Sequence, residues 1–570
     1  MTSERRGGVG RMAKFALRRA AVKAVSGLIA PFRWLSFSPF GGRIERILIA
    51  PQDLRTSDPT AAGDIYSGYF AFAGKILATE GQSPFTAFPP SRAWAETLNG
   101  FGWLRDIRAA DTALSRANSR TLVDDWIKTN GRPNSSEAWS QSVVSRRLIS
   151  WISHSPVILD GADRAFYRRF MMSIRRQAAF LWKRSKTFGI QAGRLEAAIA
   201  LTAVALCTNL GMGRKRRVVK HLIKQLQKEI LSDGGHISRN PQVLIDLLAD
   251  LLPLKHCFPS NEFPPPPELL NAIDRMMPMV RLFRHDDGTV ALFNGMSTTP
   301  PDTIATLLAY QDARAGTAET AGPSGYRRLH GEDTILIIDV GGPPPEAFSL
   351  SAHAGCLSFE LSDRGEKIIS NCGAPPEGRD THRALARATA AHSTLVIDDT
   401  STCHFAPVDQ DRWPAGGPVL EGPRIVTALR ESDEASEKIT ASHDAYAREF
   451  GVIHRRSLTL GRDGGWLIGE DTLEPASKRR PLKKKPITLR FHLHPSIRVM
   501  VHEPEIVKLE LPSGALWTFS CEKPVNVEES ILFASQDGMR RMTQLVIADT
   551  SDVGRIKWSL VREGGAVAAR

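Results

Sequence analysis

The sequence predicts an α+β protein in which a helical domain is followed by a separate β domain. From about residue 60 to 310, apolar residues recur at three- and four-residue spacing, the period of amphipathic helices. Beyond residue 325, short segments of alternating apolar and polar residues are separated by Gly, Pro, Asp and Ser, which is typical of strands joined by turns. Helices first and strands second indicate two segregated domains rather than a βαβ sheet.

Length and composition agree with a globular protein of two large domains. The chain has 570 residues, too many for one ordinary core, and its 42% of apolar residues can fill a large interior. No window reaches the roughly 18 uninterrupted apolar residues that a membrane span requires, so a soluble protein is expected. The six cysteines lack CxxC spacing, which argues against a zinc ribbon or a dense disulfide framework and fits a reducing compartment.

Residues 1–45 are predicted to form a basic N-terminal arm. The arm lacks a clean apolar stretch and a small-residue cleavage site, so no secretory signal is expected. Residues 12–30 can form a cationic amphipathic helix in peripheral contact with an anionic membrane, and a disordered arm explains the same charges equally well.

The net charge of +13 favours polyanionic partners through long-range attraction. Acidic polysaccharide, anionic membrane and nucleic acid all qualify, although solvated surface charge explains the basic clusters at residues 5–23 and 478–485 equally well. No nucleic-acid partner is expected, because the sequence has no basic stripe interleaved with aromatic residues and no helix-turn-helix signal.

The helical domain is expected to span residues 46–315. Its longest periodic stretches predict helices over residues 163–184 and 192–210. The proline-rich run at 259–267 interrupts the series because proline cannot continue a helix, and a further helix is predicted over 268–282. The run therefore separates two helices within one domain.

Small and turn-forming residues at 316–325 predict a linker, after which the β domain is expected to span 326–570. Strands are predicted at residues 334–340, 357–361, 367–370, 393–398, 457–459, 465–469, 487–492, 516–519 and 544–548. His353 and His392 each stand before one of these strands and are expected at the entrances to two strands of one sheet. Two such imidazoles can bind a metal, share a proton with a substrate or satisfy backbone groups, and spacing leaves all three open.

A glycine turn is the clearest local motif of the helical half. Asp233-Gly234-Gly235-His236 breaks the helical pattern, and Asn240 followed by Pro241 is expected to open a new helix. The turn would place His236, Arg239 and Asn240 together at one end of the helical domain, where loops often carry function. Capping and bracing of the turn is the alternative role for these three residues.

These motifs, in this order, resemble those of the heparinase II/III-like polysaccharide lyases, and the chain is identified as a divergent, alphaproteobacterial-type member over most of residues 60–550. The matching segments are residues 99–104, Asp233-Gly234-Gly235-His236 with Arg239 and Pro241, Asp287-Gly288, Phe293-Asn294-Gly295, His353-Ala354-Gly355, Asn371-Cys372-Gly373 and residues 387–394. The resemblance implies an incomplete α/α toroid followed by an antiparallel β-sandwich, with a glycan cleft at their junction. It also implies carbon–oxygen lyase activity on an acidic polysaccharide or oligosaccharide that contains uronic acid, such as a glycosaminoglycan.

β-Elimination at a uronic acid needs a group that neutralises the C5 carboxylate, a base for the C5 proton and an acid for the leaving O4. The resemblance implies catalytic roles for His236, His353, Arg239 and Asn240, and substrate contacts for Arg194, Trp103, Arg383 and Arg387. Core packing is the alternative for the tryptophan, and pairing with Asp380 or Asp398 is the alternative for the last two arginines. This chemistry requires no cofactor.

The sequence departs from the family pattern at positions that matter for proton transfer. The tyrosine expected after the glycine turn falls near Gln242, where no tyrosine stands, and Arg194 and Glu196 occupy the place of an Asn-His pair. In the β domain, Ser351 replaces the first of two closely spaced histidines. The alternative function is therefore a non-catalytic acidic-glycan-binding or cell-envelope polysaccharide assembly protein that has lost the catalytic tyrosine.

In some relatives two histidines and an aspartate hold zinc, and the matching residues here are His353, Asn371 and His392. Neutral asparagine is a poor zinc ligand and Cys372 is the available substitute, so a structural zinc ion is a secondary expectation. The resemblance implies a place in the cell envelope or periplasm, whereas the lack of a clear signal peptide favours the cytoplasm. The sequence does not indicate an oligomeric state.

Overall fold

A computed structural model describes residues 38–42, 44–185, 192–298, 301–310, 320–409, 413, 416–477, 484–535, 538–552 and 554–564, together with Leu17, Ala20 and Ala21. The chain divides into two compact units. Unit 1 contains residues 1–230, 246–274 and 306–311, and unit 2 contains residues 231–245, 275–305 and 312–570. Most of the predicted basic arm and of the basic run at 478–485 lies outside the described residues, as does the first part of the predicted linker.

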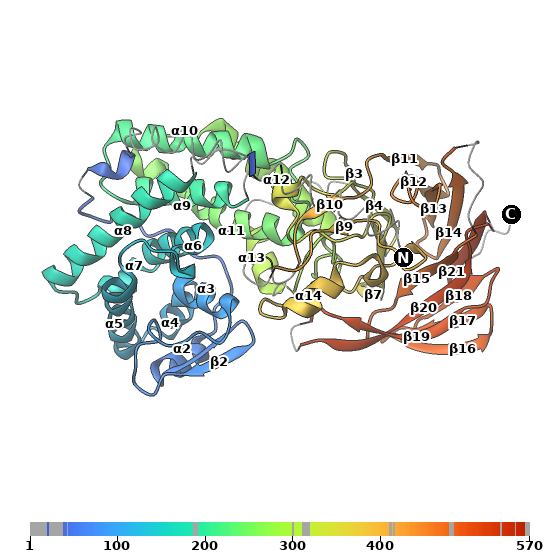
Figure 1. The fold of residues 1–570 in the computed structure, drawn as a ribbon, viewed down its shortest axis with the longest axis horizontal. Coiled ribbons are helices and arrows are strands. Elements are labelled where there is room, and N and C mark those ends of the chain that lie inside the picture. Colours follow the sequence, from blue (N-terminus) through green and yellow to red (C-terminus); the bar gives the residue numbers. More distant parts are fainter. Residues whose placement is uncertain are drawn as a thin grey trace. The chain divides into compact units, whose positions relative to one another are not determined.

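The described residues of unit 1 form a helical domain with a β-hairpin (Figure 1). Its elements are α2 (Pro59–Tyr66), β1 (Tyr69–Phe72), β2 (Lys75–Ala78), α3 (Arg92–Gly100), α4 (Leu104–Ala110), α5 (Ala113–Asn130), α6 (Gln141–Ser153), α7 (Ser155–Leu159), α8 (Arg164–Ser185), α9 (Arg194–Cys207) and α10 (Met212–Glu229). Helices α11 (Pro241–His256), α12 (Pro267–Phe283) and α13 (Pro301–Tyr310) are divided between the two units.

Helix α9 is apolar on nearly every side and is buried accordingly, packing against α6, α8 and α10. Helices α8, α9 and α12 confirm the helices predicted from apolar spacing. The hairpin of β1 and β2 was not predicted, because strands of four residues are too short to establish an alternating pattern. Among the described residues, no helix is long and apolar enough to cross a membrane.

Unit 2 is built from antiparallel sheets. Its three large sheets have the strand orders β3-β4-β5-β6-β7, β19-β20-β15-β8 and β11-β12-β13-β14-β21-β18-β17-β16. The elements are β3 (Thr320–Ala321), β4 (Tyr326–Gly331), β5 (Thr334–Asp339), β6 (Phe359–Asp363), β7 (Glu366–Ile369), α14 (Asp380–Ala386), β8 (Leu395–Ile397), β9 (His404–Phe405), β10 (Val419–Glu421), β11 (Val426–Ser432), β12 (Ser436–His443), β13 (Val452–Gly461), β14 (Trp466–Pro475), β15 (Pro486–His492), β16 (Arg498–Glu503), β17 (Ile506–Glu510), β18 (Leu516–Cys521), β19 (Asn526–Leu532), β20 (Arg540–Thr550) and β21 (Arg555–Arg562).

One aromatic cluster joins the three large sheets. Phe359 of β6, Phe491 of β15 and Trp558 of β21 each come from a different sheet. The ring of Trp558 lies 5.7 Å from that of Phe359 and 4.7 Å from that of Phe491, and all three side chains are buried. The inner faces of the sheets therefore share one core, which is the packing of a β-sandwich.

The strands that follow His353 and His392 belong to different sheets, which corrects the expectation of one sheet. β6 pairs with β5 and β7, whereas β8 pairs with β15 through Leu395–Ile397. The alternation of apolar and polar residues identifies strands but does not specify their partners, so sheet membership could not be predicted. The two histidines approach each other because their sheets pack on a common core.

The division into units differs from the expected boundary at residue 315, because residues 231–245 and 275–305 belong to unit 2. Buried polar contacts explain this placement. Arg239 donates hydrogen bonds to carbonyl groups after β3 and β5, and His285 contacts Glu360 of β6 at 3.2 Å. Both segments thus contribute to the polar interior of the β domain.

Candidate functional site

Arg239 is the centre of a buried hydrogen-bond network in unit 2. Its Nε donates to the carbonyl of Ser324 (2.7 Å), Nη1 to those of Gly342 (2.7 Å) and Gly341 (3.4 Å), and Nη2 to that of Gly325 (3.3 Å) and to Asp339. A guanidinium has five N–H donors, and all five are used here. Arg239 has no N–H left for a substrate carboxylate, and its catalytic role stays a prediction.

Asp339 and Asn294 extend this network to His353. The second carboxylate oxygen of Asp339, at the end of β5, accepts from Asn294 Nδ2 at 3.0 Å, and Asn294 Oδ1 accepts from the backbone N–H of His353 at 3.3 Å. Tyr326 donates its hydroxyl proton to the Arg239 carbonyl at 2.7 Å, and burial raises the pKa of this phenol. Tyr326 is thus a fixed, neutral partner of the network.

His353 and His392 form a direct hydrogen bond, with 3.1 Å between His353 Nδ1 and His392 Nε2. The Nδ1 of His392 lies 2.8 Å from the carbonyl of Ala388, and a carbonyl only accepts, so this nitrogen carries the proton. His392 Nε2 is therefore the acceptor, and His353 Nδ1 donates to it. This tautomer leaves the lone pair of His353 Nε2 facing away from the pair, where it can accept a proton or a hydrogen bond.

Burial keeps both imidazoles neutral. It lowers the pKa of His392 to about 4 and lowers that of His353 well below its usual value, with the charges of His392, Arg387 and Arg383 adding to the effect on His353. At neutral pH the pair is uncharged, so His353 can act as a weak base or as a neutral hydrogen-bonding group.

His236 and Asn240 stabilise the glycine turn. His236 Nδ1 accepts from the backbone N–H of Ser238 at 3.2 Å, and its ring packs edge-on against Phe348. Asn240 Oδ1 accepts from the N–H of Gln242 at 2.9 Å, which confirms the predicted cap of α11, and its Nδ2 donates to Ser351 at 3.3 Å. The turn and the loop of His353 are therefore directly connected, while a catalytic role of His236 or Asn240 stays a prediction.

The two predicted substrate arginines of the β domain have different surroundings. Arg387 donates to the carbonyls of Ala352 (2.8 Å), Gly417 (2.9 Å) and Ser349 (3.0 Å), and its guanidinium lies 4.0 Å from the ring centre of Phe405. It is buried and braces the loop before His353. Arg383, one helical turn earlier, is half-exposed, and its guanidinium makes no hydrogen bond or ion pair with a described residue. Of these two arginines, Arg383 is the one that can receive an anion.

The residues expected to bind zinc do not fit that ion. Asn371 Oδ1 accepts from the N–H of Ser393 at 3.1 Å and its Nδ2 donates to Glu360, so the amide is committed to the sheet. Cys372 Sγ lies 3.7 Å from His492 Nδ1 rather than beside the histidine pair, and burial raises its pKa to about 12. Among the described residues, no three His, Cys, Asp or Glu side chains are grouped closely enough to hold a metal.

Arg194 and Trp103, the other two predicted substrate residues, belong to unit 1. Arg194 opens α9, where the charge of Glu229 raises its pKa and burial lowers it more strongly. Trp103 donates its indole N–H to the Leu98 carbonyl at 3.0 Å and packs 4.9 Å from Phe101. It also lines a cavity of about 310 Å³. Its main role is in the core, and substrate contact stays a prediction for both residues.

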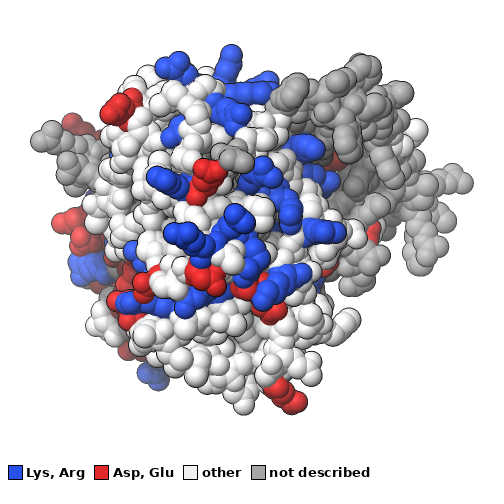
Figure 2. Space-filling view, turned by 90° about the vertical axis from the view of Figure 1, so that its left-hand side faces the viewer, with Lys and Arg blue, Asp and Glu red and all other residues white. Residues whose placement is uncertain are grey.

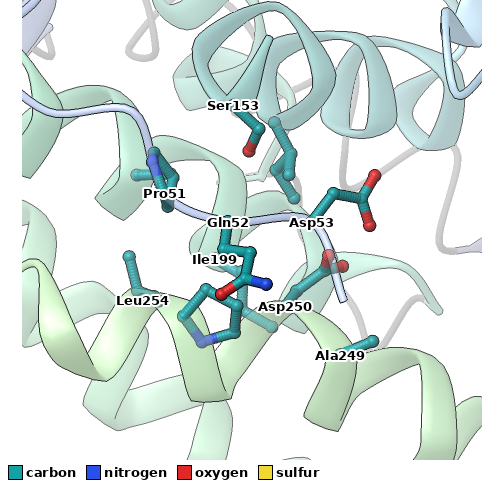
Figure 3. A pocket seen from close by; sticks show the side chains of 11 residues that line it. Pro51, Gln52, Asp53, Ser153, Ile199, Ala249, Asp250 and Leu254 are labelled. Atoms are coloured by element: carbon teal, nitrogen blue, oxygen red, sulfur yellow. The ribbon is translucent and has the colours of Figure 1, made fainter. Parts of the chain in front are cut away.

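A second cavity of unit 1 is too small for a sugar. Its volume is about 20 Å³, enough for a single water molecule. Figure 3 shows Asp53 and Asp250 on one side of it, with Pro51 and Leu254 on the other. Asp250 accepts from Arg55 at 2.8 Å and pairs with Arg146, so the charges beside this cavity are compensated inside unit 1. The cavity therefore has a structural role.

Helices α8 and α10 give unit 1 a basic face. Together they carry fourteen Lys and Arg against one acidic residue, the buried Glu229, an excess equal to the +13 of the whole chain. The helices are neighbours, since the ring of Trp182 in α8 lies 5.3 Å from that of His221 in α10. Figure 2 looks onto the side where Figure 1 places α5, α8 and α10, and Lys and Arg outnumber Asp and Glu there.

Much of this basic charge has no counter-charge. Arg175, Arg216, Lys220 and Lys224 are exposed and make no ion pair with a described carboxylate. Such an excess on one face attracts polyanions over distances of about 8–10 Å at ordinary salt. We call the exposed Lys and Arg of α8 and α10 the basic face.

Sequence reasoning missed Asp339, Tyr326 and Asn294 as parts of the site. Asp339 had a usable signal, since an acid ends a strand that is otherwise apolar and the buried β5 continues into Gly341. Asn294 was noted within a family motif but was given no role. Tyr326 had no distinguishing signal, because tyrosine at the start of a strand is common.

Comparison with known proteins identifies relatives along nearly the whole chain. The family model described as "Heparinase II/III-like, C-terminal" matches residues 314–559. The FtsZ-localized protein C of Caulobacter vibrioides (strain NA1000 / CB15N) is 30% identical over 538 residues, covering 92% of this chain and 91% of that protein.

Solved structures of polysaccharide lyases have the same fold. Heparinase III superposes with a TM-score of 0.71 at 15% identity, covering 98% of this chain and 92% of that one. A mutant of the heparan sulfate lyase HepC from Pedobacter heparinus gives 0.61 at 14% identity, with 97% and 90% covered. The chondroitin AC lyase of Streptomyces coelicolor A3, in complex with chondroitin sulphate, gives 0.52 at 11% identity, with 90% and 79% covered. Unit 1 is accordingly an incomplete α/α toroid and unit 2 a β-sandwich.

Proposed function

Since the chain belongs to the heparinase II/III-like family, we propose that it binds an acidic polysaccharide and has lost β-elimination. The observation that carries this proposal is the commitment of Arg239, whose five donors are all bound inside unit 2. Elimination depends on a cationic group that neutralises the uronate carboxylate as charge develops. Arg387 is similarly committed to backbone carbonyls, so neither of these arginines is available for that task.

The state of the tyrosines supports the same proposal. Among the described residues of unit 2, Tyr326 and Tyr446 are both buried, and each donates its hydroxyl proton to backbone carbonyls. Burial raises the pKa of both phenols. A proton that is held in this way is not available for the leaving oxygen of a glycan.

Glycan binding itself is supported by charge and by the groups that stay open. Arg383 and His353 Nε2 offer a cation and a neutral acceptor in the same part of unit 2, and the basic face of unit 1 offers a polyanion a second region of positive potential. The lyases of similar fold are named for heparan sulfate and chondroitin, both acidic polysaccharides.

The relative from Caulobacter is named for its localisation with FtsZ and not for an activity. We extend that localisation to this chain, so that it would bind acidic glycan at the site of FtsZ. A fluorescent fusion imaged together with FtsZ tests this part.

The primary test combines binding with turnover. Purified protein is titrated with alginate, glycosaminoglycans, pectate and bacterial exopolysaccharides, while absorbance is followed near the unsaturated-uronate band. We expect saturable binding of at least one acidic polymer and no rise in absorbance. A rise that is abolished by His353→Gln would reject the loss of elimination.

That outcome would support the second candidate function, a divergent lyase in which His353 is the base. One observation favours it: the tautomer of the histidine pair leaves the lone pair of His353 Nε2 directed away from His392. Arg383 would then be the residue that neutralises the carboxylate, and Arg383→Met should remove turnover together with binding.

A further inference from the structure

Unit 2 contains a polar cavity of about 190 Å³ that the histidine pair does not line. Its wall is formed by the segment before α13 and by residues at the ends of β7, β15, β19 and β20. The polar residues that line it include Lys367, His494, Thr298, Arg540 and Asp287. The volume suits a small molecule of the size of one sugar ring or less.

Lys367 carries a buried charge whose ion pair with Glu360 is too long for a hydrogen bond. Its side chain is 6% exposed, and the nearest carboxylate oxygen, Glu360 Oε2, lies 3.8 Å from Nζ. The ammonium makes no hydrogen bond with a described residue, although it has three donors. A buried ammonium without acceptors is unfavourable, so the donors of Lys367 require an oxygen from outside the protein.

Glu360 is occupied by other donors. Its Oε1 accepts from the backbone N–H groups of Leu292 and Asn371, both at 3.0 Å, and its Oε2 lies 3.2 Å from His285 Nε2. Together with the charge of Lys367, these bonds hold the pKa of Glu360 below its usual value, while the ammonium itself makes no hydrogen bond to the carboxylate. The ammonium of Lys367 can accordingly pair with a second anion on the cavity side.

Two neutral donors line the same cavity. Ser496 N–H donates to His494 Nδ1 at 3.4 Å, so Nδ1 is unprotonated and Nε2 carries the proton. Burial lowers the pKa of His494 to about 4, which keeps this ring neutral. The Oγ1 of Thr298 is buried and has no hydrogen-bond partner among the described residues. His494 and Thr298 therefore present donors to the cavity rather than charges.

Among the residues that line this cavity, Asp287 is the carboxylate. Asp287 Oδ1 accepts from the backbone N–H and from the hydroxyl of Thr289, at 2.8 and 2.7 Å, so this carboxylate is bound within its own turn. Arg540 adds a second cation to the wall. A cavity lined by two cations, two neutral donors and one carboxylate that is bound within its own turn is complementary to an oxyanion.

We propose that this cavity binds a small oxyanion, a carboxylate or a phosphate, with Lys367 as the cation that pairs with it and His494 and Thr298 as hydrogen-bond donors. The site is distinct from the surroundings of His353 and does not depend on the proposed glycan binding. A free sugar acid and a phosphate share the chemistry, and the experiment separates them.

Calorimetric titration of the full chain with sodium phosphate and with sodium glucuronate, at constant ionic strength, tests this inference. Glucose is the neutral control. We expect binding of at least one anion, with a Kd raised about tenfold or more by Lys367→Met, since a charge-assisted hydrogen bond contributes roughly 1.5–3 kcal/mol. Binding of phosphate or of glucuronate shows which class of anion the cavity accepts. The matched variant Lys438→Met, at a surface lysine of unit 2, should leave the Kd unchanged.

Thr298→Val provides a second test in case Lys367→Met does not fold. Without ligand this variant should melt at a higher temperature than the native protein, because an unpaired buried hydroxyl is replaced by a methyl group. In the presence of the anion it should bind about threefold or more weakly, for the loss of one neutral hydrogen bond. Anion binding that is identical in the native protein and in both variants, or no binding of either anion, would overturn the inference.

Discussion

His353 donates its Nδ1 proton to Nε2 of His392 across 3.1 Å, and the carbonyl of Ala388 fixes the direction of this hydrogen bond. The arrangement requires both rings to be neutral. Protonation of His392 Nε2 would turn two donors toward each other inside a buried site. The pair therefore links the stability of unit 2 to pH.

The free energy of unfolding should fall as the pH is lowered from about 6.5 to about 4. Burial lowers the folded-state pKa of His392 to about 4, so in this range the unfolded chain binds the proton and the folded protein does not. The contribution of His392 is fully present above the unfolded pKa and is lost as the pH falls toward the folded value, on the order of 3 kcal/mol at most. His392→Gln should flatten the profile measured by urea unfolding at several pH values. The exposed His330→Gln is the control, and an equal slope in both variants would contradict the prediction.

Replacing Arg239 should destabilise unit 2 strongly. Arg239→Met leaves Asp339 buried without its cation, a change that typically costs about 3–5 kcal/mol. Arg239→Lys should recover only part of the loss, because an ammonium cannot reach the four carbonyls and the carboxylate that the guanidinium contacts. The double variant Arg239→Met with Asp339→Asn should be more stable than the sum of the single effects predicts. Additive effects in chemical denaturation would exclude the coupling.

The local features of this fold could be predicted from the sequence, and the long-range ones could not. Periodicity located α8 and α9, and cap chemistry located Asn240 at the start of α11. The partners of Arg239 are 85 to 103 residues away in the chain, in loops that no local pattern connects to it. A motif identifies which residues are present, whereas their availability depends on contacts formed during folding.

The predicted site illustrates the same limit. His353 and His392 were predicted to lie together, and they are hydrogen-bonded to each other. The prediction that their strands share one sheet was wrong, because the alternation of residues along a strand does not indicate which strand pairs with it. Lys367 was overlooked because a lysine in an alternating strand is ordinarily on the solvent side. In the structure Lys367 is buried and lines the same cavity as Ser297 and Thr298, which lie far from it in the sequence.

Arg383→Met should weaken glycan binding and Arg387→Met should lower stability, although the two residues are one helical turn apart. Arg387 holds three carbonyls, so its loss should lower the free energy of unfolding by roughly 2–4 kcal/mol. Arg383 has no described partner, so its loss should leave stability within about 0.5 kcal/mol and weaken binding of acidic polysaccharide. Denaturation curves of both variants check the predicted stabilities, and glycan titrations of the same preparations check the predicted affinities. Unchanged glycan affinity in Arg383→Met would remove this residue from the proposed site.

Charge reversal on the basic face should weaken polyanion binding in a salt-dependent manner. Arg216, Lys220 and Lys224 follow one another at four-residue spacing along α10 and therefore share one side of the helix. Reversing all three to Glu should lower the affinity for an acidic polysaccharide about tenfold or more at low salt, and the difference should shrink as added salt screens it.

The matched control reverses Arg364, Lys438 and Arg498, surface residues of unit 2 that each pair with a carboxylate. It makes the same change in net charge, so an equal loss of affinity in the two triple variants would show that overall charge, and not the α10 side of unit 1, governs binding. A loss confined to the α10 variant would instead locate a polyanion contact on the basic face, because only there are the reversed cations free of an acidic neighbour among the described residues.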